Sequence, residues 1–339
     1  MGWRFNGPVA LRLAMLISAI AALLGAPCFG EETTVSVEEV KRAWADRRTK
    51  VTSFQYEFDS IEDRIETIVD GRVQAPSARN ARDRKTCEVQ LSTALVVKMD
   101  GKRIAYAIHG DGGRMSCKAI PGCSWSGGCD GAINWDMHTS PTRGVPTHGT
   151  FLRRGVPQTP LTASGTLKPI WMWYDPLTFL DATGHDVNRM TLSGTTLKRE
   201  GRDQLRLNVP RKKGTWNAEL LLANSPPFSP TRLTLLREKV PMMTLQLHHT
   251  VYPLGGDSLA SWKETQLGDN GLLWFTHAAV ASSFTANKKF EDSEFEGKFP
   301  IGTHLREFSD VHTEKAYWIQ STETEMKQIT SSEYLSDIK

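Results

Sequence analysis

The sequence predicts a mainly β protein with some helix, in which a large antiparallel sheet is curled or partly closed. Three observations support this prediction. Patterns typical of short strands recur at regular spacing along most of the chain. Asp-Gly pairs separate strand-like arms in "ETIVDGRVQ" and "VVKMDGKRIAYAI", which is a strong hairpin signal. One segment near the start has helical periodicity. We expect a single domain over residues 31–325 and a tail over 326–339 that forms a short helix or stays frayed.

The N-terminus has the pattern of an export signal. Two arginines precede the apolar run from Leu13 to Ala26, which is shorter than the roughly 20 residues of a membrane-spanning helix. We assign residues 1–30 to a signal peptide and expect cleavage near Ala26 or Gly30. Lipidation at Cys28 is the less favoured alternative. The mature protein is therefore expected in the periplasm or secreted, with no integral membrane span.

Length and charge limit the classes of function. A chain of 339 residues can bury a sizeable core, and its formal net charge of +3 gives no strongly basic face. This balance argues against a dedicated nucleic-acid partner. The basic segment "RNARDRK", residues 79–85, is a local exception. A solvated loop is the favoured interpretation, and contact with anionic headgroups or another acidic surface is the alternative.

The first element after the leader is an amphipathic helix in "SVEEVKRAWADRRTKV". Ser36 and Glu39 have the spacing of a capping box, and apolar residues recur at helical spacing at Val37, Val40, Trp44 and Val51. A strand follows directly, because "SFQYEFDS" alternates aromatic and polar residues.

Further strands are expected along the rest of the chain. "TTLKREGRDQLRLNV" predicts a hairpin with its turn at Gly201. The remaining strand patterns are "WNAELLLA", "TRLTLLRE", "MMTLQLHHTVY", "SWKETQL", "LLWFTHAAVASSF", "KKFEDSEF", "HLREFSD" and "AYWIQS". In "FPIGT", Pro300 fixes a backbone angle that suits a turn, and Gly302 adopts turn conformations without steric strain. We therefore expect a turn here, directly before the strand "HLREFSD".

Residues 110–184 are rich in Gly, Pro and Cys, and we interpret them as a loop-rich insertion. Apart from Cys28, the chain has an even number of cysteines, as expected for disulfides in an oxidising compartment: Cys87, Cys117, Cys123 and Cys129. The last three are separated by gaps too long for a zinc ribbon or finger. We expect disulfides whose pairing the sequence does not fix, with free thiols and a metal site as less favoured alternatives. No cofactor or metal is expected.

The order of these elements resembles the outer-membrane lipoprotein carrier (LolA-like) superfamily, and most closely its large uncharacterised secreted bacterial relatives. The resemblance includes a terminal phrase at Phe295, Phe299, Pro300, Gly302, Thr303, Asp310 and Tyr317. It also includes part of a strand-pair phrase at Trp262, Glu264, Gly268 and Trp274. The resemblance implies a strongly curved, incompletely closed antiparallel sheet wrapped around the N-terminal helix, with an inner face that accepts acyl chains.

If this resemblance extends to function, the protein binds or carries an acyl lipid or a lipoprotein. The candidate cavity-lining residues are Trp44, Phe54, Tyr56, Phe58, Trp171 and Trp173. Each buried methylene contributes about 0.8 kcal/mol, so one acyl chain can bind with no specific polar contact. The alternative is that these six side chains fill a closed core, as most large apolar residues do.

Catalysis is not expected, because the chain has no nucleophile elbow, no HExxH pair, no P-loop and no dinucleotide fingerprint. Asp136 and His138 in "NWDMH" would share one face of a strand, whereas His248 and His249 would point to opposite faces. Three functions remain: an acyl-lipid carrier, a cell-envelope interaction or scaffold module without a small ligand, and a secreted hydrolase. An open apolar cavity favours the first, a filled core with an exposed apolar patch the second, and a polar cleft with a perturbed carboxylate or histidine the third.

Overall fold

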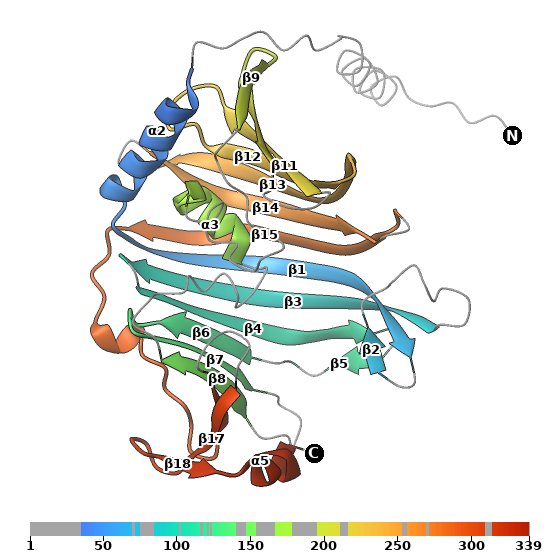
Figure 1. The fold of residues 1–339 in the computed structure, drawn as a ribbon, viewed down its shortest axis with the longest axis vertical. Helices are drawn as coiled ribbons and strands as arrows, with labels where there is room; N and C mark the ends of the chain where they lie inside the picture. The colour runs from blue at the N-terminus through green and yellow to red at the C-terminus, as the bar shows by residue number, and fades with distance from the viewer. Residues whose placement is uncertain are drawn as a thin grey trace, which may run out of the picture.

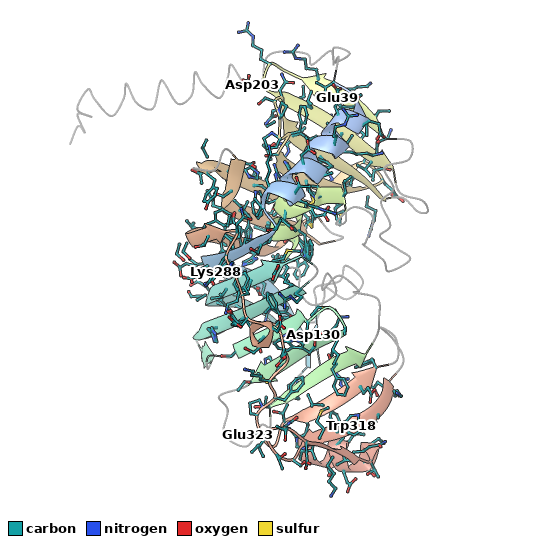
Figure 2. The ribbon with its side chains drawn as sticks, turned by 90° about the vertical axis from the view of Figure 1, so that its left-hand side faces the viewer. Glu39, Asp130, Asp203, Lys288, Trp318 and Glu323 are labelled. Atoms are coloured by element: carbon teal, nitrogen blue, oxygen red, sulfur yellow. The ribbon has the colours of Figure 1, made fainter. Side chains whose placement is uncertain are left out.

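The computed structural model describes residues 35–69, 72–74, 85–101, 103–115, 118–120, 122, 124–139, 147–153, 167–177, 195–210, 216–252, 256–268, 271–308 and 314–338. The expected signal peptide and residues 79–84 of the basic segment lie outside these ranges. The described chain is elongated, with Glu39 and Glu323 near its opposite ends (Figure 2).

Within the described residues, 18 strands form one sheet that is not closed. The strands are β1 (Ser53–Val69), β2 (Arg72–Gln74), β3 (Lys85–Asp100), β4 (Arg103–Met115), β5 (Lys118–Ile120), β6 (Ser124–Cys129), β7 (Ile133–Thr139), β8 (His148–Arg153), β9 (Thr196–Glu200), β10 (Gln204–Pro210), β11 (Trp216–Ala223), β12 (Pro230–Arg237), β13 (Val240–Tyr252), β14 (Gly256–Leu267), β15 (Leu273–Ala286), β16 (His304–Phe308), β17 (Glu314–Gln320) and β18 (Met326–Ile329). The mainly β, antiparallel prediction is confirmed at this level.

Hydrogen-bonded pairing runs from β9 through β10, β11, β12, β13, β14 and β15 to β1, and then through β3, β4, β6, β7, β8, β16 and β17 to β18. The short strands β2 and β5 pair with β1 and β4. Among these pairings only β8 with β16 is parallel, so the sheet is almost a meander (Figure 1).

Two helices pack on one face of the sheet, which we call the inner face: α2 (Val37–Lys50) and α3 (Lys168–Tyr174) (Figure 1). The predicted capping box of α2 is present. The Glu39 amide donates to Ser36 Oγ at 3.2 Å, and the Ser36 amide donates to Glu39 Oε2 at 2.7 Å. The helix buries Val40, Trp44 and also Arg47.

The predicted hairpin turns are confirmed at two glycines. Gly101 between β3 and β4 has φ +59°, and Gly201 between β9 and β10 has φ +68°, the left-handed region that a glycine adopts without strain. The strand expected at "KKFEDSEF" is wrong, because Asp292–Glu294 form a 3-10 turn there. Its aromatic residues, Phe290 and Phe295, pack on each other with ring centroids 5.5 Å apart instead of lining one strand face.

The interpretation of residues 110–184 as a loop-rich, disulfide-tied insertion is corrected. Its described parts include β6, β7 and β8, which continue the sheet, and α3, which covers the inner face. Glycines in β6 permit close approach and do not mark loops: a Cβ on Gly127 would lie 2.3 Å from the Tyr106 hydroxyl. Cys129 is buried with a free thiol, so its predicted disulfide is wrong. The side chains of Cys87, Cys117 and Cys123 lie outside the described residues.

The end of the chain belongs to the sheet. "FPIGT" forms the expected turn, in which Gly302 has φ +86° and the Thr303 amide donates to the Pro300 carbonyl at 3.0 Å. The tail contains strand β18 and helix α5 (Ser331–Ile338), so the helical alternative is confirmed and the strand was missed. No helix in the described part of the chain is long and apolar enough to cross a membrane.

Candidate functional site

The sheet divides into two halves with different packing. We call β9 to β15 with β1, β3, α2 and α3 the helical half, and β6, β7, β8, β16, β17, β18 and α5 the terminal half; β4 joins them. The six residues proposed as cavity lining all lie in the helical half. Each is 5% exposed or less: Trp44, Phe54, Tyr56, Phe58, Trp171 and Trp173.

Four of these side chains, Phe54, Tyr56, Phe58 and Trp173, pack directly on one another. The Phe54 ring lies 5.6 Å from Tyr56 and 5.3 Å from Trp173, and the Tyr56 and Phe58 rings stack at 4.8 Å between centroids. The Tyr56 hydroxyl accepts a hydrogen bond from the Leu259 amide at 2.6 Å. Burial raises the pKa of Tyr56 above its ordinary value. The structure therefore brings the six residues together as the centre of a packed core.

Helix α3 occupies the position where an inner-face ligand would lie. Seven residues cannot hold a helix by backbone propensity alone, so burial of its side chains accounts for its formation. Those buried residues are Pro169, Ile170, Trp171, Met172, Trp173 and Tyr174. Pro169 at the start of the helix supplies a fixed φ where no amide donor is needed.

A buried ionic network holds both helices to the sheet. Arg47 of α2 lies 3.0 Å from Asp257 Oδ1 of β14, donates to Ser229 Oγ at 2.6 Å, and also donates to the Trp173 carbonyl. Asp257 accepts from Ser229, and the Trp173 indole donates to the Asp257 carbonyl at 3.0 Å. Burial lowers the pKa of Arg47, and the Asp257 carboxylate opposes that shift.

Further polar contacts in this half involve His249 and the ion pair of Lys168 with Glu264. His249 lies 3.3 Å from Asp257 and 2.6 Å from the Pro230 carbonyl, whereas His248 is exposed, as expected for adjacent residues on a strand. At the other end of α3, Lys168 Nζ lies 3.0 Å from the buried Glu264 carboxylate. These contacts fix α3 at both ends.

A small pocket opens beside Arg47, between the end of α2 and the Pro226-Pro227 loop. Its volume is about 200 Å³, and Tyr252 and Phe284 supply its aromatic walls. The lower limit for typical ligand pockets is about 300 Å³, so this pocket is small for an acyl lipid.

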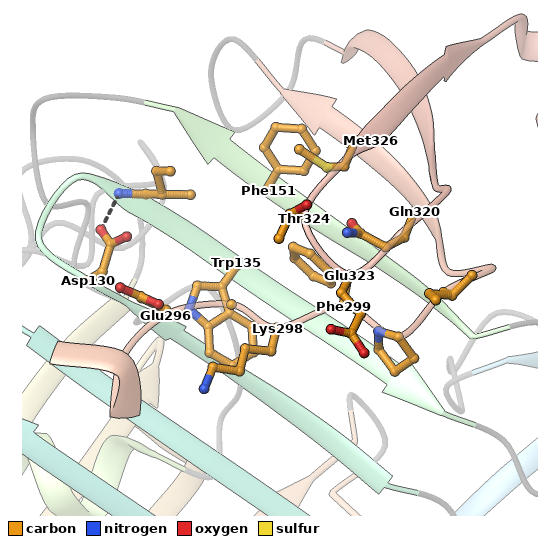
Figure 3. A pocket seen from close by; sticks show the side chains of 14 residues that line it. Asp130, Trp135, Phe151, Glu296, Lys298, Phe299, Gln320, Glu323, Thr324 and Met326 are labelled. Carbon is orange, nitrogen blue, oxygen red and sulfur yellow. Dashed lines mark hydrogen bonds between the residues drawn. The ribbon is translucent and has the colours of Figure 1, made fainter. Parts of the chain in front are cut away.

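A larger hollow, which we call the groove, lies in the terminal half. Its volume is about 950 Å³. It is lined by Asp130, Ile133, Trp135, Phe151, Glu296, Gly297, Lys298, Phe299, Pro300, Ile301, Gln320, Glu323, Thr324 and Met326. Figure 3 shows that these side chains come from β7 and β8, from the segment before β16, and from the connection between β17 and β18.

The segment 295–301 forms one wall of the groove because it packs against Trp135. The Trp135 indole donates to the Phe295 carbonyl at 3.0 Å, and its ring meets Phe299 edge-on at 6.3 Å between centroids. Gly297 lies on the indole face, where an added Cβ would be 2.7 Å from Trp135 Cγ. A side chain at position 297 would therefore push this wall outward.

The groove has an apolar floor and a mostly acidic rim. Trp135, Phe151, Phe299 and Met326 supply the floor (Figure 3). Asp130, Glu296 and Glu323 carry the negative charges on the rim, and Lys298 carries one positive charge. Asp130 Oδ1 is held by the amides of Ala132 and Ile133, each at 2.8 Å, whereas Glu296 and Glu323 are exposed. An extended chain with apolar and basic side chains matches such a surface.

Asp136 and His138 lie on the inner face of the terminal half. They do not form the hydrogen-bonded pair considered from the sequence: Thr150 Oγ1 donates to Asp136 Oδ2 at 2.7 Å, and His138 packs on His148 at 5.1 Å between ring centroids. Burial raises the pKa of Asp136 and lowers that of His138. In the part of the chain that the structure describes, no group of three or more His, Cys, Asp or Glu could hold a metal ion.

Most of the groove was missed from the sequence, because its walls come from four separated segments. The one available signal was the patterned phrase "FEGKFPIG", whose Phe295, Phe299 and Pro300 were interpreted as fold determinants. Trp135, Phe151 and Met326 carried no local pattern that would distinguish them from core residues.

Comparison with known proteins gives similarity to solved structures only. No protein-family model and no curated protein match the chain. One similar structure is the LolA superfamily protein NE2245 from Nitrosomonas europaea, at 11% identity and a TM-score of 0.29, covering 78% of this chain and 99% of that chain.

A second similar structure is MucB in complex with MucA(peri), at 12% identity and a TM-score of 0.18, covering 82% of this chain and 74% of that chain. The first match is to the superfamily that the sequence resembles. Both similarities are remote, and neither indicates a function for this chain.

Proposed function

We propose that this protein is an exported interaction module, without catalytic activity, that holds an extended segment of a partner protein in the groove. The segment would present apolar side chains to the floor and a lysine or arginine to the rim. The contrast between a groove of about 950 Å³ in the terminal half and a packed core in the helical half carries this proposal.

The packed core argues against an acyl chain on the inner face of the helical half. A carrier would have to move α3, which buries six side chains and is tied by Arg47 and Lys168. Exposing each large apolar side chain costs about 1.5–3 kcal/mol, so the displacement would cost on the order of 10 kcal/mol. The lipid would bind only if its own contacts with the protein were more favourable than this cost of displacing α3.

The composition of the groove supports a protein partner. Tryptophan, phenylalanine and methionine are enriched at the centres of protein interfaces, and a polar rim surrounds such centres. Three carboxylates against one lysine give the rim a net negative charge, which complements a basic segment. An extended partner also fits the adjacent sheet edge, because β18 pairs only with β17 among the described strands.

A direct test uses a fluorescein-labelled nonapeptide in which lysine alternates with valine and phenylalanine, and the matching peptide with glutamate in place of lysine. Fluorescence polarisation should show saturable binding of the lysine peptide by the mature chain, at least about tenfold tighter than the glutamate peptide. Equal binding of the two peptides, or none, would contradict the proposal.

Single substitutions test whether the lysine peptide binds in the groove. Met326→Ala removes part of the floor and should weaken binding of the lysine peptide by about tenfold or more, as truncation of a central apolar contact does. Glu323→Gln should weaken it by roughly two- to fivefold, because an exposed ion pair contributes about 0.2–1 kcal/mol. Glu325→Gln is the matched control, since Glu325 lies in the same connection but does not line the groove. The Glu323 effect should shrink as salt is raised.

Acyl-lipid binding is the second candidate, favoured by the apolar character of the inner face of the helical half. It predicts a stoichiometric lipid in the purified chain, lost in Phe54→Asp or Tyr56→Asp. Folded chain that stays free of lipid after incubation with phospholipid vesicles would exclude it. Export to the periplasm or medium is part of both candidates, and N-terminal sequencing of the mature chain tests it.

A further inference from the structure

Within the terminal half, β16, β17 and β18 are joined to the rest of the sheet by a single strand pair, β16 with β8. These strands lie far apart in the sequence, 148–153 and 304–308, and they pair in parallel. Parallel pairing is slightly less stable per residue than antiparallel pairing. Beyond this seam lie β17, β18 and α5, and the groove takes Gln320 and Met326 from that side and Trp135 and Phe151 from the other.

Three histidines cross the seam in register. His138 of β7 is directly opposite His148 of β8, and His148 is directly opposite His304 of β16. Paired residues share one face of the sheet, with Cβ atoms about 4.5–5.5 Å apart. The His138 and His148 rings are 5.1 Å apart between centroids, and His304 continues this row of histidines in register on the inner face.

The surroundings of His138 favour a neutral imidazole, and His304 is buried. His304 is 5% exposed and meets the Tyr334 ring of α5 at 6.1 Å, and the buried His138 Nδ1 has no hydrogen-bond partner. Burial, with the neighbouring His148, lowers the pKa of His138. A protonated row would place like charges directly opposite each other on two successive strand pairs, an arrangement that destabilises pairing.

The charged neighbours do not neutralise such a row. Arg306, two residues along β16 on the same face, adds a permanent positive charge that is shared with Glu314 at 3.1 Å. Asp136 is the one carboxylate beside the histidines on β7, and its effect on His138 is smaller than those of burial and His148. Phenols of the described residues also face the row: Tyr106 of β4, Tyr317 of β17 and Tyr334 of α5.

We propose that His138, His148 and His304 form an acid-sensitive seam, which holds β16, β17 and β18 to the sheet when the imidazoles are neutral and loosens when they are protonated. Histidine changes charge near pH 6.5, so mild acid is the signal. The groove has walls on both sides of the seam, and acid would therefore separate them and release a bound segment. This consequence for binding rests on the proposed function; loosening of the seam does not.

Hydrogen exchange with mass spectrometry tests the seam on the full mature chain at about pH 7.5 and about pH 5, after correction for the intrinsic pH dependence of exchange. In the wild type, amides of β16 and β17 should exchange about tenfold faster at the lower pH, a larger change than that of the amides of β11 to β14. Equal corrected exchange of β16 and β17 at the two pH values would overturn the proposal.

Two variants test whether the histidine row causes the pH dependence of exchange in β16 and β17. His148→Gln removes the central imidazole and should abolish most of the pH dependence of β16 and β17, and His138→Phe should reduce it. His248→Gln, at an exposed histidine on β13, should behave as the wild type. A pH response that survives both His148→Gln and His138→Phe would also overturn the proposal. Binding of the lysine nonapeptide at both pH values is a separate readout, so failure of the groove and failure of the seam remain distinguishable.

Discussion

The two halves of the sheet use aromatic residues in opposite ways. In the helical half, Trp173 and Tyr56 are fully buried, and α3 covers the inner face. In the terminal half, Trp135 and Phe299 line an open groove on the other side of the sheet from the histidine row. One continuous sheet thus carries a packed core at one end and an open groove at the other, where we propose that recognition occurs.

This difference follows from what covers each half. The helical half has two helices on its inner face, pinned by the Arg47 network, and the pocket beside Arg47 is small. In the described part of the terminal half, α5 lies at its end, and the extended segment 295–301 crosses it without filling the space beside it. Stability and binding can therefore be changed separately, and the predictions below use that separation.

The largest effect is expected on the free energy of unfolding, from a substitution in the helical half. Arg47→Met leaves the Asp257 carboxylate buried without its cationic partner, which should lower the free energy of unfolding by about 3–5 kcal/mol. Urea denaturation followed by tryptophan fluorescence measures this change. The double variant Arg47→Met/Asp257→Asn should lose less than the two single variants added together. Strict additivity would show that the ion pair does not tie α2 to β14.

The next largest effect is expected on peptide binding, from a substitution in the groove wall. Gly297→Ala places a Cβ against the Trp135 ring, and the wall must shift, so the lysine nonapeptide should bind at least about tenfold more weakly. Overpacking of this kind should cost about 1–3 kcal/mol of stability. Gly256→Ala is the matched control, because no atom lies within 4 Å of an added Cβ there. Unchanged peptide binding in Gly297→Ala would show that segment 295–301 does not take part in peptide recognition.

A smaller effect is expected from pH in the helical half. Burial lowers the pKa of His277, with the Glu264 carboxylate opposing. The folded state therefore disfavours the protonated ring: its stability is complete above the unfolded pKa of about 6.5 and falls as the pH drops below that value. Urea denaturation at two pH values should show this loss, and His277→Gln should reduce it. A wild-type stability that rises on acidification would contradict the assignment.

The smallest effect concerns Cys129. Its thiol is buried and burial raises its pKa, so iodoacetamide should not modify it in the folded chain. After denaturation without reductant, mass spectrometry should find it alkylated. A disulfide at Cys129 would restore the original prediction and contradict its position in the core.

The sequence was informative where structure is local. The capping box at Ser36 and the turns at Gly101 and Gly201 were predicted correctly, because a few adjacent residues determine them. "WMWYDP" gave no periodicity long enough to indicate α3, whose helix depends on tertiary burial. Gly127 was interpreted as a loop residue, although it makes room for Tyr106 across a strand pair.

The groove was beyond sequence reasoning for a related reason. Trp135, Phe299 and Met326 meet only because a parallel pair brings β16 beside β8, a contact between segments about half the chain apart. The six residues predicted to line a cavity do lie together in space. Their use as core or as lining depends on α3, which no local pattern predicted.

The central claim is that the inner face of the helical half is a filled core and that recognition occurs in the groove. Native mass spectrometry of the mature chain, purified from the periplasm without detergent, tests it most directly. The account predicts the mass of the polypeptide alone. One phospholipid or acylated peptide per chain, lost in Tyr56→Asp, would contradict it and would restore the acyl-carrier function.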